Sequence, residues 1–168
     1  MNQKKMLSAL EIAKISCDIE SDGVSFYNDA ADAVSDPEMK SLFETLSEKE
    51  FQHLNTFRKL YAELDEKMGG AESAAEYLFD DEITQYLKVI SEGLIFLTGD
   101  DLKAWFREPY SAKEALNMAL SVEKHSILFY TEIASFNLFA QSQAILKGII
   151  EEEKSHVIMI GQMIRGME

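Results

Sequence analysis

The sequence predicts an all-α protein, an antiparallel four-helix bundle. Three observations support this prediction: apolar residues recur every three or four positions over long segments, helix-start signals precede those segments, and the first half of the chain is repeated in the second. The 168 residues contain only two prolines and eight glycines, so few natural break points divide them. We therefore expect one domain over residues 1–168, in which 46% hydrophobic residues can form a core without disulfides.

Four long helices are expected, at about residues 9–34, 37–66, 112–136 and 139–165. A serine followed three residues later by a glutamate, the spacing of a capping box, begins at Ser8, Ser73 and Ser111. Asp36 stands before Pro37, and proline is favoured at the first helical position because its missing N–H needs no partner there. These signals predict where the first three long helices begin and add a shorter helix after residue 73.

An internal repeat relates the two halves of the chain at an offset of 103 residues, without a gap. The matched polar and aromatic pairs are Glu20 with Glu123, Phe26 with Phe129, Tyr27 with Tyr130, Glu50 with Glu153 and His53 with His156. The repeat predicts two helical hairpins, at about residues 9–66 and 112–165. The segment of about 67–110 between them is too long for a plain loop, so we expect a crossover with one or two short helices. This is the connectivity of ferritin-like four-helix bundles.

Charge and cysteine content exclude several classes of protein. The chain has 16 basic and 30 acidic residues and a net charge of -14, which disfavours nucleic acids and anionic membranes as partners and favours cations. No segment reads as a signal peptide or a membrane span, so we expect a cytoplasmic protein. The single cysteine, Cys17, rules out a disulfide framework and a rubredoxin or zinc-ribbon module within these residues.

Six side chains of ligand type are expected to meet inside the bundle. An acid and an imidazole lie in the middle of an apolar stripe on the second long helix, and the pair recurs on the fourth. Glu20 and Glu50 are each 15 residues from position 35 at the hairpin turn, so both lie about 22 Å from it. The acidic run at residues 151–153 is expected to be a solvated face with only its last member inward. The expected cluster is Glu20, Glu50, His53, Glu123, Glu153 and His156.

Four carboxylates in a dry core repel one another, so such a cluster has to take up protons or cations. Two divalent cations neutralise four carboxylates. One glutamate from each of two helices, with Glu-x-x-His from each of the other two, is the inward-facing ligand set of di-iron and di-manganese sites in bundles. Oxygen and imidazole donors suit iron or manganese better than a structural zinc. The donors therefore predict two divalent cations, either iron or manganese.

The whole pattern resembles that of rubrerythrin-type ferritin-like proteins, over all four long helices. In each hairpin a glutamate precedes Phe-Tyr by six and seven residues, and a Glu-x-x-His motif follows 30 residues after that glutamate. The resemblance implies two iron ions, with manganese or zinc as substitutes. It implies bridging roles for Glu50 and Glu153, terminal roles for Glu20 and Glu123, and one metal ion each for His53 and His156. It also implies that Tyr27 and Tyr130 donate hydrogen bonds to the ligands or transfer electrons.

Two departures from the family affect the expected chemistry. Ser126 stands where rubrerythrins carry a further glutamate, so we do not expect the family's redox-linked shift of an iron between Glu and His ligands to carry over. Without a rubredoxin domain, electrons have to come from a separate protein. The six ligands equally resemble a bacterioferritin ferroxidase centre, but Phe51 replaces its haem-binding methionine, and only 12 residues follow His156.

We expect a non-haem di-iron oxidoreductase that reduces peroxide or dioxygen with electrons from an external donor protein. The small residues Gly23, Ala119 and Ser126 beside the centre are expected to leave room for such a ligand. One alternative at the same site is binding and oxidation of Fe²⁺. Another is a non-catalytic bundle that metal stabilises, and a metal-free bundle is a further alternative. The resemblance also implies a homodimer.

Overall fold

The computed structural model describes residues 9–68, 85–87, 89, 111–135 and 140–167. Its helices are α1 (Ala9–Ala33), α2 (Pro37–Met68), α5 (Ala112–Ala134) and α6 (Ala140–Gly166). The four predicted long helices are therefore confirmed, and their ends differ from the predicted ends by at most two residues. The predicted crossover lies almost wholly outside the described residues, as do the caps expected at Ser8 and Ser73.

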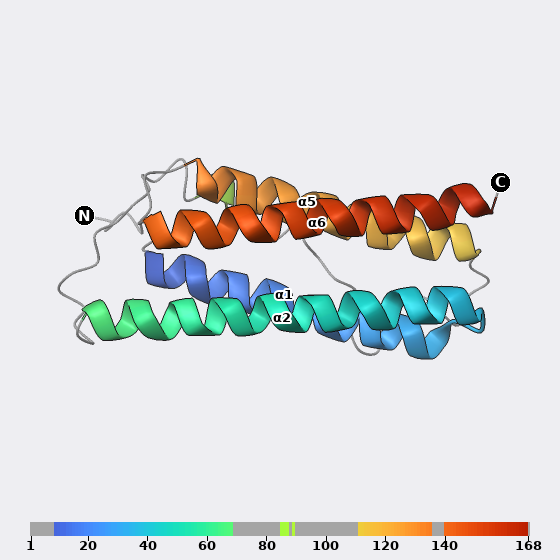
Figure 1. Cartoon of the computed structure of the whole chain (residues 1–168), viewed down its shortest axis with the longest axis horizontal. Coiled ribbons are helices and arrows are strands. Elements are labelled where there is room, and N and C mark those ends of the chain that lie inside the picture. The colour runs from blue at the N-terminus through green and yellow to red at the C-terminus, as the bar shows by residue number, and fades with distance from the viewer. Residues whose placement is uncertain (1–8, 69–84, 88, 90–110, 136–139, 168) are drawn as a thin grey trace.

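The four helices form two antiparallel hairpins that lie side by side (Figure 1). α1 packs along α2, α5 packs along α6, and α2 also contacts α6 across the interface between the hairpins. α2 and α5 run in the same direction, which is the arrangement of a ferritin-like bundle with one long crossover (Figure 1). None of the helices in the described part of the chain combines the length and the apolar character that a membrane crossing needs.

The helix-start signals that fall on described residues form the caps that the sequence predicts. The backbone N–H of Glu114 donates to Oγ of Ser111 at 3.2 Å, and the N–H of Ser111 donates to Oε2 of Glu114 at 2.6 Å, so the capping box is complete. At α2, Oδ1 of Asp36 accepts from the N–H groups of Glu38 and Met39 at 3.0 and 2.8 Å. These bonds fix where α2 and α5 begin, and hence the height of the polar residues along each helix.

The core is mainly apolar above and below one level of buried glutamates and histidines. Aromatic side chains that are fully buried fill much of it: Phe26, Tyr27, Phe43, Phe57, Phe129 and Tyr130. The ring of Tyr27 stacks on Phe43 with centroids 6.1 Å apart, and the ring of Tyr130 stacks on Phe57 at 5.3 Å. Each stack joins a residue of α1 or α5 to a residue of α2, so the two tyrosine hydroxyls are held rigidly at the height of the polar level.

Replacing the cap of α2 is expected to destabilise the fold without touching the polar level. Asp36→Ala removes the acceptor of two backbone N–H groups and should lower the free energy of unfolding by about 1 kcal/mol. Urea unfolding followed by circular dichroism measures this change. Ser35→Ala, at the exposed neighbouring position, is the control and should change the free energy of unfolding by less than about 0.5 kcal/mol. Equal effects of the two variants would contradict the capping role.

Candidate metal centre

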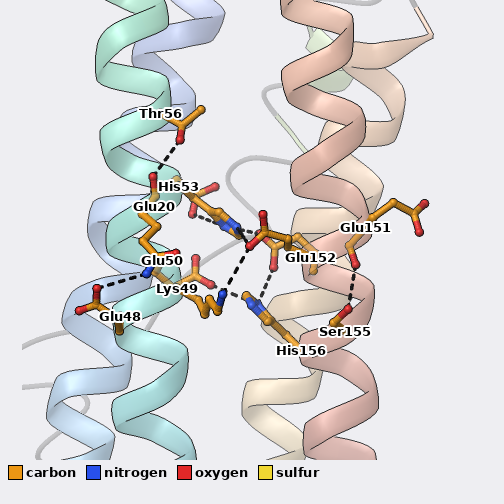
Figure 2. A network of polar contacts seen from close by, with 12 residues as sticks. Glu20, Glu48, Lys49, Glu50, His53, Thr56, Glu151, Glu152, Ser155 and His156 are labelled. Carbon is orange, nitrogen blue, oxygen red and sulfur yellow. Dashed lines mark hydrogen bonds and ion pairs between the residues drawn. The ribbon is translucent and has the colours of Figure 1, made fainter.

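The six predicted ligand residues lie together at the middle of the bundle. Glu20 comes from α1 and Glu123 from α5, while α2 and α6 each supply a glutamate and a histidine one turn apart. All six residues are buried, with at most 4% of the surface of each residue exposed. Positions three residues apart on a helix point in nearly the same direction, which is why each Glu-x-x-His pair is buried as a unit. Figure 2 shows Glu50 and His53 pointing from α2 toward α6.

The six residues form two overlapping groups, each suited to one metal ion. One group is Glu20, Glu50, His53 and Glu153, and the other is Glu50, Glu123, Glu153 and His156. Within each group the ligand atoms all lie within 4.8 Å of one another. Glu50 and Glu153 belong to both groups, so the geometry has two positions with two carboxylates between them.

Both histidines direct Nδ1 toward the carboxylates. Nδ1 of His53 lies 3.1 Å from Glu153 and 3.5 Å from Glu20. Nδ1 of His156 lies 3.0 Å from Glu153, 3.3 Å from Glu123 and 3.4 Å from Glu50. The two imidazole rings stack with centroids 5.7 Å apart, so they stand on the same side of the carboxylates.

Several fully buried ligand atoms lack a hydrogen-bond partner among the described residues. They are Oε2 of Glu20, Oε1 of Glu50, both carboxylate oxygens of Glu153, both ring nitrogens of His53 and Nε2 of His156, although ion pairs such as that of His156 with Glu153 connect some of these residues. A buried polar atom without a partner costs about 1–3 kcal/mol, and more if it is charged. Divalent cations satisfy carboxylate oxygens and imidazole nitrogens, and a donor set of oxygen and nitrogen is the set that iron and manganese prefer. The residues therefore fit a pair of such ions.

Two of the carboxyl groups have raised pKa values. Burial, reinforced by the charges of Glu153, Glu20 and Glu123, raises the pKa of Glu50 well above its ordinary value. Burial and the charge of Glu153 raise the pKa of Glu123 to about 8, against the opposing effect of His156. In the metal-free protein at neutral pH, Glu123 therefore holds a proton, and burial favours the protonated form of Glu50.

The pKa values of the two histidines and of Glu153 are shifted so that the charged form of each group is favoured. Burial alone would lower the pKa of His53, but its ion pairs with Glu153 and Glu20 outweigh burial and raise the pKa to about 10. Burial likewise opposes the charged form of His156, whose ion pairs with Glu123, Glu153 and Glu50 raise its pKa to about 12. Burial disfavours the charged form of Glu153 too, yet its ion pairs with both histidines lower its pKa. Protons thus supply the positive charge when metal is absent.

Two buried tyrosines connect the hairpins through this cluster. The hydroxyl of Tyr27 on α1 donates to Oε1 of Glu123 on α5, and the hydroxyl of Tyr130 on α5 donates to Oε1 of Glu20 on α1. Burial and the adjacent carboxylates raise the pKa of both hydroxyls well above the ordinary tyrosine value, so both remain protonated donors. A role of these tyrosines in electron transfer stays a prediction.

Gly23 gives room to a ligand side chain rather than to a small molecule. A Cβ atom at this position would lie 3.0 Å from Oε2 of Glu50 and 3.3 Å from its Cγ. The space beside Gly23 is therefore filled by Glu50, and the expectation that it admits peroxide was wrong. Its counterpart Ser126 is also buried.

One contact beside the cluster was missed from the sequence. Glu152 is exposed, as expected for a mainly solvated face, and Oε2 of this residue also lies 3.5 Å from Nε2 of His53 and 3.9 Å from Nζ of Lys49 (Figure 2). The acidic run identified Glu152 only as a polar neighbour of a ligand. Nothing in the period of α6 predicts that its side chain reaches across to α2.

Comparison with known proteins places the chain in a family. A family model described as Rubrerythrin matches residues 11–94, which is half of the 168 residues. A crystal structure from Thermotoga maritima, described as that of a ferritin-like diiron-carboxylate protein, superposes with a TM-score of 0.68 at 24% sequence identity. That match covers 99% of this chain and 100% of the other, and it supports the ferritin-like fold. No curated protein matches the chain significantly.

Enlarging Gly23 is expected to disturb the centre more than the fold. Gly23→Ala should displace the Glu50 carboxylate and weaken metal binding, which a titration with Co²⁺ measures by visible absorption. Gly148→Ala on α6 is the matched control, because its new Cβ has nothing within 4 Å. The control should gain about 0.5–1 kcal/mol of stability and bind Co²⁺ normally. Unchanged Co²⁺ affinity in Gly23→Ala would contradict the close approach of Glu50.

Metal binding is expected to release protons and to tighten as the pH rises. Below about pH 8 the metal-free site holds protons on Glu123, whose pKa is about 8, and on His53, whose pKa is about 10. An incoming cation has to displace these protons, so its apparent affinity rises until they are lost. Calorimetric titration with Zn²⁺ in two buffers of different ionisation enthalpy counts the protons released. An affinity independent of pH between about 6 and 8 would contradict this linkage.

Proposed function

The chain belongs to the rubrerythrin family, and we propose that its buried cluster binds two iron ions and reduces peroxide or dioxygen with electrons from an external donor. The observation that carries this proposal is the pair of overlapping ligand groups, which share two carboxylates. Paired ions bridged by carboxylates are typical of redox sites in helical bundles.

Each side chain has a defined part in this proposal. Glu50 and Glu153 bridge the two ions because both belong to each group. Glu20 and His53 complete one position, and Glu123 and His156 complete the other. The two positions are related by the same offset that relates the hairpins in the sequence.

The protein residues would bind and orient the ions and keep water away from them. Each ferrous ion, when bound, supplies one electron to the reaction. Tyr27 and Tyr130 hold the terminal carboxylates through their hydroxyl protons, so neither glutamate can rotate freely. The apolar core on both sides of the cluster excludes bulk water, which strengthens the electrostatic interactions and limits side reactions.

Electrons would reach this site from a separate redox protein. The 168 residues contain a single cysteine, so the four-cysteine iron site of a rubredoxin cannot be built from them. Oxidation of Fe²⁺ as a substrate is the second candidate, and the net charge of -14 favours it because an acidic surface attracts cations.

Anaerobic loading with Fe²⁺ followed by addition of peroxide tests the proposal. We expect two iron ions per chain by elemental analysis and sustained consumption of peroxide when a chemical reductant is present. Sustained consumption of Fe²⁺ with dioxygen, without reductant-dependent turnover of peroxide, would instead identify an Fe²⁺ oxidase. Bound iron that reacts with neither oxidant would identify a non-catalytic metal site.

The double variant Glu50→Ala with Glu153→Ala is expected to abolish binding of both ions, because it removes both shared carboxylates. Glu48→Ala with Glu151→Ala is the matched control, since it removes two exposed glutamates from the same two helices. The control should retain two ions and full turnover. Retention of both ions by the first variant would overturn the assignment of the bridging ligands.

A further inference from the structure

The two halves of the candidate metal centre differ just outside the ligands. Both histidines turn Nδ1 toward the carboxylates and therefore turn Nε2 away from them. Nε2 of His53 faces Oε2 of Glu152 at 3.5 Å. Nε2 of His156 is buried, and the ion pairs of His156 with the described residues all involve its Nδ1. Neither Nε2 has a hydrogen-bond partner among these residues, so the histidines differ in the carboxylate that faces His53 alone. Related histidines thus have unlike surroundings.

The sequence repeat explains this difference. Glu152 and Lys49 occupy equivalent positions, each one residue before a shared glutamate and four before a histidine, because 49 plus the offset of 103 is 152. An ammonium group cannot accept a hydrogen from an imidazole, so Lys49 cannot serve as an acceptor for His156, whereas Oε2 of Glu152 faces Nε2 of His53. Nζ of Lys49 instead lies 3.9 Å from Glu152, at the interface of α2 and α6 (Figure 2).

We propose that Glu152 is a positioning residue that makes the two metal positions unequal, so that the ion bound by His53 is held more tightly than the ion bound by His156. The inference rests on the proposed binding of two ions. A carboxylate that accepts the outer N–H of a ligating imidazole fixes the ring and makes the inner nitrogen a better ligand. Removal of such a partner weakens metal binding by about 10- to 100-fold.

The position of Glu152 suits this role. Its side chain is 49% exposed whereas that of His53 is 3% exposed, so the carboxylate lies at the boundary between solvent and the buried ring. The contact with Lys49 directs the carboxylate toward α2. Glu152 itself belongs to neither ligand group.

Single-histidine variants allow each position to be measured separately with Co²⁺, whose visible absorption reports binding. His156→Ala leaves only the position of His53 complete, and His53→Ala leaves only the other. We expect the His156→Ala protein to bind its first Co²⁺ about 10- to 100-fold more tightly than the His53→Ala protein. Adding Glu152→Ala to the His156→Ala protein should remove its higher Co²⁺ affinity. Adding Glu152→Ala to the His53→Ala protein should leave the Co²⁺ affinity unchanged.

The control is Glu151→Ala, which removes the same charge from the neighbouring exposed residue and should not change Co²⁺ affinity in either background. Nitrogen NMR of the Zn²⁺-loaded full-length protein gives a second readout, in which Glu152→Ala should shift the Nε2 signal of His53 and not that of His156. Equal weakening in both backgrounds, or an effect no larger than that of Glu151→Ala, would overturn the inference. Two ions bound with equal affinity would refute this inference alone, whereas no bound Co²⁺ in the unmodified protein would refute the proposed function as well.

Discussion

Four carboxylates enclosed in an apolar core are the constraint on which the rest of this molecule depends. Carboxylates at such close range cannot all be ionised in a medium of low dielectric constant unless positive charge lies among them. Two imidazoles supply part of that charge, and protons on Glu50 and Glu123 reduce the rest of the repulsion when metal is absent. The cost of this arrangement is tolerable only because aromatic and aliphatic packing on both sides fixes the bundle independently of the cluster.

The internal repeat turns this local constraint into a symmetric site. Each hairpin contributes a terminal glutamate, a shared glutamate and a histidine at the same height, and the hydroxyls of Tyr27 and Tyr130 cross between the hairpins. These crossed bonds hold each terminal carboxylate from the opposite hairpin, so the site can form only when the hairpins are paired in one register. The symmetry ends outside the ligands, where Glu152 on α6 corresponds to Lys49 on α2.

Much of the fold and the ligand set could be predicted because helical period and capping rules act locally. The apolar stripes predicted which face of each helix points to the core, and Asp36 and Ser111 predicted where two of the helices begin. Contacts between hairpins were not predictable in this way. The period of α1 shows that Tyr27 faces inward, but not that its hydroxyl reaches Glu123 on α5. The filling of the space at Gly23 by Glu50 depends on a rotamer of the neighbouring helix, which no spacing rule contains.

The contact of Glu152 with His53 could not be predicted either, because helical period does not describe contacts between helices. A residue one position before an inward ligand is turned by about 100° around the helix, so a stripe model assigns it to solvent. A long side chain can nevertheless lie back over the edge of the stripe and cover a ligand on the next helix. The side chain of Glu152 reaches His53 in this way, so a half-exposed carboxylate lies 3.5 Å from the buried imidazole. At the interface between α2 and α6, charge on the surface of the protein thus lies beside charge in its interior.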